Sequence, residues 1–299
     1  MAEGAGELAG VIPIVCTPFD EREEVDTGSL AREVDFLLGC GVHGVGIGFG
    51  SEIHRLTDDE RDLVVTTVAG RVAGRLPVIA GVGAGSLHAA CCRARAAGSA
   101  GASVLMVTPP PVTGVTADDL VDYYGAVAEA SGLPIMVQDA PGMTGVQMPV
   151  PTLVRLARQL DAVVALKIEA QPTAPKLGAV AEALEGTAAA LGGAGGLDFY
   201  HELERGAAGT IPGPAFAARF VTIWRDYVAG RHSAAFEGLA SLLPALTLSS
   251  RGTDTFLYVQ KELLRRKGVL GSARLRRPCE PFDPRLDHEI AGAVAALAP

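Results

Sequence analysis

Short apolar runs alternate with longer amphipathic segments along most of this 299-residue chain. The runs are rich in valine and isoleucine and are continuous, as is typical of strands buried on both faces. The segments between them carry apolar residues at helical spacing, as in residues 26–41 and 57–74. Thr57, which precedes three acidic residues, is a predicted helix N-cap. The predicted strands lie within residues 10–19, 42–50, 76–85, 103–111, 133–141, 163–169, 187–196 and 206–213.

Eight strand–helix units predict a (β/α)8 barrel. The alternative is an open, doubly wound sheet, which the glycines in residues 44–50 and 81–85 would suit, although neither stretch forms a GxGxxG motif. We favour the barrel because of the number of repeats. After residue 230, helical patterns follow one another without strands. We therefore expect residues 1–230 to form the barrel and residues 231–299 to form a C-terminal helical extension of the same domain.

The extension carries a basic cluster within a chain of net charge −9. A solvated helix face or a subunit contact explains this cluster better than nucleic-acid binding, which needs a basic surface. Its members are Lys261, Arg265, Arg266, Lys267, Arg274, Arg276 and Arg277.

The composition, with 48% hydrophobic and 20% charged residues, is that of a globular protein. No apolar run reaches the roughly 18–20 residues that span a bilayer, and the first ten residues lack the basic and apolar regions of a signal peptide. We expect a cytoplasmic protein with free thiols, no membrane partner and no metal. The five cysteines, which show no metal-binding spacing, are Cys16, Cys40, Cys91, Cys92 and Cys279.

Lys167 is the only lysine in a predicted strand, at the end where a barrel carries its functional residues. A desolvated lysine gives up its proton more easily, and the neutral amine can attack a carbonyl carbon. The alternative is an ion pair with Glu169 or Asp139. The residues alone leave both interpretations open.

The loop GFGSE, residues 48–52, follows the second predicted strand. Its small residues would let backbone N–H groups and the Ser51 hydroxyl hold a carboxylate. Taken by itself, a tight turn without a ligand explains this loop at least as well.

These features together resemble the dihydrodipicolinate synthase/N-acetylneuraminate lyase family over essentially the whole chain. The resemblance rests on the opening GVIPIVCTPFD, the loop GFGSE with its glutamate, the strand LPIMVQDAP and the lysine of LKIE. It implies a (β/α)8 barrel with a C-terminal helical extension, assembled as a homodimer or homotetramer, and no metal or organic cofactor. It also implies that Lys167 forms a Schiff base with a 2-keto acid.

Several positions depart from the family pattern. Gln138 stands where most members have a proton-relaying tyrosine, and Met143 stands where an arginine often binds a second carboxylate. Ser51 replaces the last glycine of the second loop, and Pro110 or Pro111 replaces a second tyrosine. The ordinary proton relay is therefore missing. The combination of IMVQDAP, SE and KIE resembles the 2-keto-3-deoxy-sugar-acid dehydratase subgroup, most closely L-2-keto-3-deoxyarabinonate dehydratase.

An iminium on Lys167 would acidify the C3 proton of the substrate, and loss of that proton together with a C4 hydroxyl is a dehydration. Retro-aldol cleavage needs a base on the C4 hydroxyl, and an amide such as Gln138 cannot take a proton at neutral pH. We therefore expect a dehydratase of a 2-keto-3-deoxy sugar acid or similar 2-keto acid, with Lys167 and Gln138 as its catalytic residues. A pyruvate-dependent aldolase or condensing enzyme is the alternative, and a non-catalytic sugar-acid-binding barrel is a third.

The expected substrate site lies around these two residues at the strand ends. Asp139 is a candidate base, and equally a structural carboxylate where the family has asparagine. Phe49, Met143 and residues 109–111 make the expected pocket more apolar than a pentonate needs. The predicted substrate-binding residues are Phe49, Gly50, Ser51, Asp139, Met143, Gly193 and Thr210.

Overall fold

The computed structural model describes residues 8–295 and places eight parallel strands in one sheet, in the order β1-β8-β7-β6-β5-β4-β3-β2. A parallel bridge between Ile14 and Gly46 joins the β1 and β2 segments and closes the ring. The predicted (β/α)8 barrel is therefore confirmed. The strands are β1 (Gly10–Val11), β2 (Val45–Ile47), β3 (Val78–Gly81), β4 (Val104–Val107), β5 (Ile135–Asp139), β6 (Val163–Ile168), β7 (Ala189–Gly192) and β8 (Gly209–Thr210).

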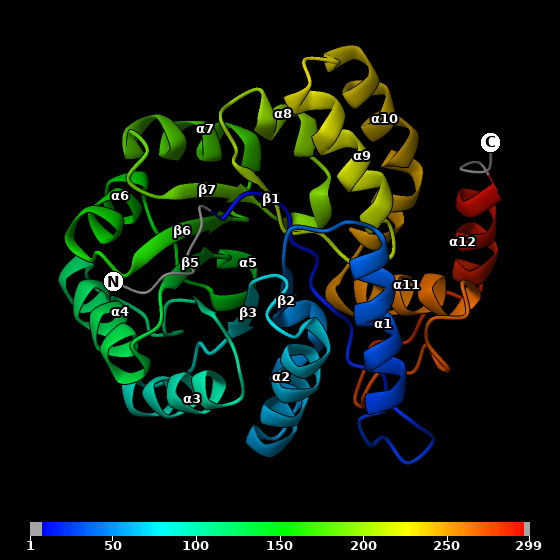
Figure 1. Ribbon diagram of the computed structural model, residues 1–299, viewed down its shortest axis with the longest axis horizontal. Helices are drawn as coiled ribbons and strands as arrows, with labels where there is room; N and C mark the ends of the chain where they lie inside the picture. Colours follow the sequence, from blue (N-terminus) through cyan, green and yellow to red (C-terminus); the bar gives the residue numbers. More distant parts are fainter. Residues whose placement is uncertain (1–7, 296–299) are drawn as a thin grey trace.

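Helices surround the strands, and α10–α12 gather at one side of the molecule (Figure 1). The predicted cap is present, because the Thr57 side chain accepts a hydrogen bond from the Glu60 N–H at the start of α2. The helices are α1 (Thr27–Gly39), α2 (Asp58–Val72), α3 (Leu87–Ser99), α4 (Ala117–Ser131), α5 (Pro141–Thr144), α6 (Val150–Gln159), α7 (Thr173–Leu184), α8 (Phe199–Leu203), α9 (Ala217–Val228), α10 (His232–Ser249), α11 (Thr253–Arg266) and α12 (Leu286–Ala295). Within residues 8–295, the short 3₁₀ helices are η1 (Phe49–Ser51), η2 (Ile53–Arg55) and η3 (Ala194–Gly196).

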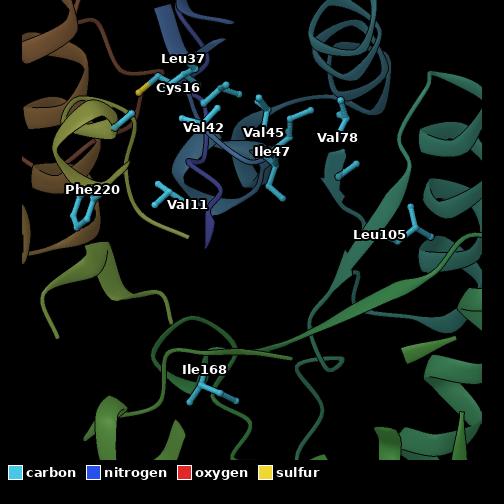
Figure 2. Packing of buried hydrophobic residues seen from close by; sticks show 14 of the residues in the cluster. Val11, Cys16, Leu37, Val42, Val45, Ile47, Val78, Leu105, Ile168 and Phe220 are labelled. Atoms are coloured by element: carbon cyan, nitrogen blue, oxygen red, sulfur yellow. The ribbon is translucent and has the colours of Figure 1, made fainter. Parts of the chain in front are cut away.

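Two hydrophobic clusters divide the core into the barrel interior and the layer between strands and helices. Ala165 and Met136 belong to the interior cluster, whereas Leu166 and Val137 belong to the outer one. Figure 2 shows residues of the outer cluster, including Ile168 of β6. Because successive strand side chains point to opposite faces, this alternation places Lys167 and Gln138 on the inner side.

The C-terminal helices are fixed to the barrel by buried polar contacts. Lys261 of α11 forms an ion pair with Glu52, in which both side chains are fully buried. The Gln260 side chain accepts a hydrogen bond of 3.0 Å from the Ala215 N–H, after β8. The boundary expected at residue 230 falls in the turn between α9 and α10.

The basic cluster of the extension is largely paired within the chain. Arg276 contacts Glu60, Arg277 contacts Glu23, and both Arg265 and Arg266 contact Glu262. Lys261 is buried, so the expectation of a solvated face is wrong for this residue. Among residues 8–295, no helix is long and apolar enough to cross a membrane.

Glu202 of α8 is a buried carboxyl whose two oxygens have no hydrogen-bond partner within the described residues. Burial raises its pKa from 4.5 to about 8. A raised carboxyl pKa means that the folded state binds the proton more tightly, so the stability contributed by this group falls as pH rises from 4.5 to about 8.

We expect Glu202→Gln, which stays neutral at every pH, to stabilise the fold relative to wild type by about 1–3 kcal/mol at pH 8. The advantage should shrink towards pH 5. Urea unfolding at the two pH values measures it, and Glu237→Gln on the exposed part of α10 is the matched control. An equal loss of stability at both pH values would contradict this account.

Candidate functional site

A cavity of about 360 Å³ opens at the ends of β5 and β6 and contains both predicted catalytic residues. Gln138 and Lys167 are register partners on these neighbouring strands. Both side chains point into the barrel and therefore lie side by side, and each residue is at most 4% exposed. The volume is in the range of small-molecule sites, roughly 300–1,000 Å³.

Glu169 joins the two predicted catalytic residues. Its Oε2 lies 3.1 Å from Lys167 Nζ and accepts a hydrogen bond of 2.7 Å from Gln138 Nε2. Its Oε1 accepts a hydrogen bond of 3.0 Å from the Ala194 N–H. Burial alone would raise the pKa of Glu169, but the Lys167 ammonium and these hydrogen bonds outweigh it and lower the pKa. Glu169 is therefore a carboxylate at neutral pH.

Gly193 leaves space for this carboxylate. A Cβ at Gly193 would lie 2.5 Å from Glu169 Cγ, which is closer than such atoms approach. Gly193 does not line the cavity itself, although we predicted that it binds substrate. Its position instead lets Glu169 reach Lys167.

Three other predicted substrate-binding residues line the cavity. Phe49 and Gly50 come from η1, after β2, and Met143 comes from α5. The Met143 side chain is 46% exposed at the cavity mouth. The expectation of a substantially apolar pocket therefore agrees with this lining.

Ser51 lies elsewhere, because its hydroxyl is already used. The Ser51 Oγ donates to the Val15 carbonyl and accepts from the Gly48 N–H. The side chain is fully buried and does not line the cavity. Ser51 therefore fixes the shape of the loop, and the prediction that its hydroxyl holds a substrate carboxylate is corrected.

Asp139 and Thr210 face the helix layer, because their neighbours Gln138 and Ile211 face the cavity. Asp139 forms an ion pair of 2.6 Å with Lys176 of α7. Neither residue lines the cavity. This corrects their assignment to substrate binding, and it makes Asp139 a structural carboxylate rather than a base.

Pro111, one of the two prolines that we matched to the second tyrosine, borders a neighbouring cavity, whereas Pro110 does not line it. Pro109 and Pro111 line this second space, which shares Phe49, Gln138 and Met143 with the first. Among residues 8–295, no tyrosine lines the cavity that holds Lys167. Within the same residues, no group of three or more histidine, cysteine or acidic side chains could hold a metal ion.

The sequence analysis did not assign Glu169 to the site, although a usable signal existed. Residues two apart on a strand share a face, so the Lys-x-Glu spacing places Glu169 on the side of Lys167. The wall contributed by α10, α11 and the turn between them was also missed. Its residues are Leu246, Ser249, Ser250, Gly252, Thr253, Phe256 and Leu257.

Comparison with known proteins gives matches over nearly the whole chain. The model of the dihydrodipicolinate synthetase family matches residues 7–297. An L-2-keto-3-deoxyarabonate dehydratase of Azospirillum brasilense is 32% identical over 298 residues, which cover 97% of this chain and 94% of that protein. The crystal structure of a dihydrodipicolinate synthase from Rhodopseudomonas palustris superposes with a TM-score of 0.89 at 28% identity, over 97% of both chains. A 4-hydroxy-tetrahydrodipicolinate synthase of Stenotrophomonas maltophilia is 36% identical over 50% of this chain and 51% of its own length.

Proposed function

We propose that this chain, which belongs to the dihydrodipicolinate synthetase family, dehydrates a 2-keto-3-deoxy sugar acid through a Schiff base on Lys167. The family and the enzyme class, a lyase, agree with the sequence-based expectation. The observation that carries the proposal is the convergence of Lys167 and Gln138 on the Glu169 carboxylate, in a cavity that no tyrosine of residues 8–295 lines.

The first step is formation of the imine. Glu169 Oε2, 3.1 Å from Lys167 Nζ, is placed to accept the ammonium proton. The neutral amine then attacks C2 of the keto acid, and the proton held by Glu169 leaves with the C2 hydroxyl as water, which gives an iminium and restores the Glu169 carboxylate. The positive charge of the iminium then takes the place of the ammonium beside the Glu169 carboxylate.

The second step is elimination. The iminium withdraws electrons from C3, and the Glu169 carboxylate takes a C3 proton to give an enamine. The enamine electrons then form the C3–C4 double bond as the C4–O bond breaks, and the proton held by Glu169 leaves with the hydroxyl as water. Hydrolysis of the remaining iminium releases an unsaturated 2-keto acid and restores Lys167. A hydroxyl on C5 would allow a further proton shift to an aldehyde.

Gln138 selects between elimination and aldol cleavage. Its Nε2 donates to Glu169, so its carbonyl oxygen is left to accept from a substrate hydroxyl or from water. An amide orients such a group but does not remove its proton at neutral pH. Gln138 therefore supplies no base for retro-aldol cleavage at the C4 hydroxyl, and the proton-accepting group, Glu169, acts at C3 in the proposed reaction.

The substrate carboxylate fits against η1. The N–H groups of Phe49 and Gly50 open this short helix and have no acceptor within it, and both residues line the cavity. Backbone donors of this kind bind anions without a charged side chain. We also propose, in line with the family resemblance, a cytoplasmic enzyme that forms a homodimer or homotetramer.

Product analysis tests the reaction. With a five-carbon 2-keto-3-deoxy sugar acid, wild type should release a dehydrated semialdehyde, and borohydride should trap the substrate on the enzyme, as read by intact mass. Gln138→Tyr places a phenol where the hydroxyl or water is held, and should lower dehydration about 10²-fold through lost positioning. Pyruvate as the main wild-type product would replace the dehydratase with the alternative, an aldolase.

A further inference from the structure

The Phe256 ring lines the cavity that holds Lys167, between two loops that follow different strands. A Cβ built on Gly50, after β2, would lie 3.4 Å from Phe256 Cε1. A Cβ built on Gly195, after β7, would lie 3.7 Å from Phe256 Cε2. These are ordinary van der Waals separations, so the two edges of one ring approach the two loops.

The ring edge near Gly50 stands on the side of the barrel opposite Lys167. In the closed strand order, β2 faces β6 and β1 faces β5 across the barrel axis. The β6 and β5 strands carry Lys167 and Gln138, and Phe256 lines the same cavity from the side of η1. With its carboxylate against η1, as proposed above, a keto acid joined to Lys167 through C2 would meet the ring edge near Gly195 where its far end turns towards the β7 loop.

Phe256 is held in this place by the helix that carries it. One turn further along α11, Gln260 is hydrogen-bonded to the Ala215 N–H, and the next residue, Lys261, forms the buried pair with Glu52. Glu52 directly follows η1. The backbone of α11 that carries the ring is therefore tied to the η1 loop, and moving the two apart would disrupt a buried ion pair.

We propose that Phe256 is a specificity-determining residue that limits the length of the substrate chain beyond C4. This inference rests on the proposed Schiff-base function and adds the substrate class: short 2-keto-3-deoxy acids, with five carbons preferred over six. An aromatic ring that lines a small cavity discriminates by size, and one methylene in such a pocket changes kcat/KM by roughly 10–200-fold.

The test compares kcat/KM for six-carbon and five-carbon 2-keto-3-deoxy sugar acids in three variants. Phe256→Ala should raise the six-to-five ratio at least about 10-fold, and Phe256→Leu should raise it less. Phe256→Trp should lower it. The matched control is Phe236→Ala, which removes an aromatic ring that is 49% exposed on α10, and this ratio should stay at the wild-type value.

If the Phe256→Ala variant does not fold, the Phe256→Leu and Phe256→Trp variants test the proposal. An unchanged ratio in both would overturn the proposal, as would an equal change in the Phe236→Ala control. The proposed reaction is judged separately. If wild type forms a trapped adduct but releases pyruvate, the proposal of dehydration is wrong. The role of Phe256 is then still tested by the rate of adduct formation with the six-carbon acid divided by the rate with the five-carbon acid. If wild type forms no adduct with either acid, both proposals fail.

Discussion

Lys167→Ala should abolish turnover and borohydride trapping while the protein stays folded, with kcat/KM reduced at least about 10³-fold. The reason is that one amine forms the covalent intermediate and no other lysine can replace it. The chain has four lysines. Lys176 pairs with Asp139, Lys261 with Glu52, and Lys267 donates to the Ala215 carbonyl, so none of the three lines the cavity.

Lys167→Arg is the matched control for this result. A guanidinium keeps the positive charge beside Glu169 but does not form an imine under these conditions. If Lys167 acted only as a charge, the Arg variant would keep much of the activity, and covalent catalysis would be excluded. Intact mass after borohydride treatment and circular dichroism separate loss of the adduct from loss of the fold.

The barrel and the pairing of Lys167 with Gln138 were predictable because they depend on patterns close in sequence. Valine- and isoleucine-rich runs marked the strands, and the ends of neighbouring parallel strands meet at one face. The runs were longer than the strands, since each run also contained the loop that follows. Residues 10–19, for example, contain β1 and the segment that closes the ring at Ile14.

Asp139 and Thr210 lie outside the cavity for one physical reason: we assigned residues by their place at a strand end without asking which way each side chain points. Ser51 lies outside it for another, because its hydroxyl is already used in hydrogen bonds to the backbone. Asp139 follows the inward Gln138, so it must face outwards, where Lys176 neutralises it. The same alternation would have assigned Glu169 to the site. The alternation of side chains along a strand could not have predicted the roles of Phe256 and Lys261. Both lie on α11, which packs against a loop some 200 residues earlier in the sequence.

Glu169→Gln should lower kcat about 10²–10⁴-fold while borohydride trapping on Lys167 persists. Glutamine keeps the size of the side chain and can still accept the Ala194 N–H, but it cannot take the C3 proton or return one to the leaving hydroxyl. Because Lys167 is intact and water can take its proton in place of Glu169, an adduct should still form, though more slowly, and accumulate ahead of elimination. The measurement is single-turnover product formation alongside the yield of trapped adduct.

The pH dependence gives a second readout of the same variant. The pKa of Glu169 is lowered from 4.5 in the folded enzyme, so the carboxylate is ionised throughout the neutral range. The wild-type rate should therefore lose the contribution of this base only as pH falls below 4.5, and Glu169→Gln should lack that acidic decline. The matched control is Glu202→Gln, which neutralises a buried carboxyl that lies outside the cavity and should leave kcat close to wild type. A Glu169→Gln enzyme that turns over at the wild-type rate would remove Glu169 from the mechanism. Loss of trapping along with turnover would assign Glu169 to imine formation alone and require another base at C3.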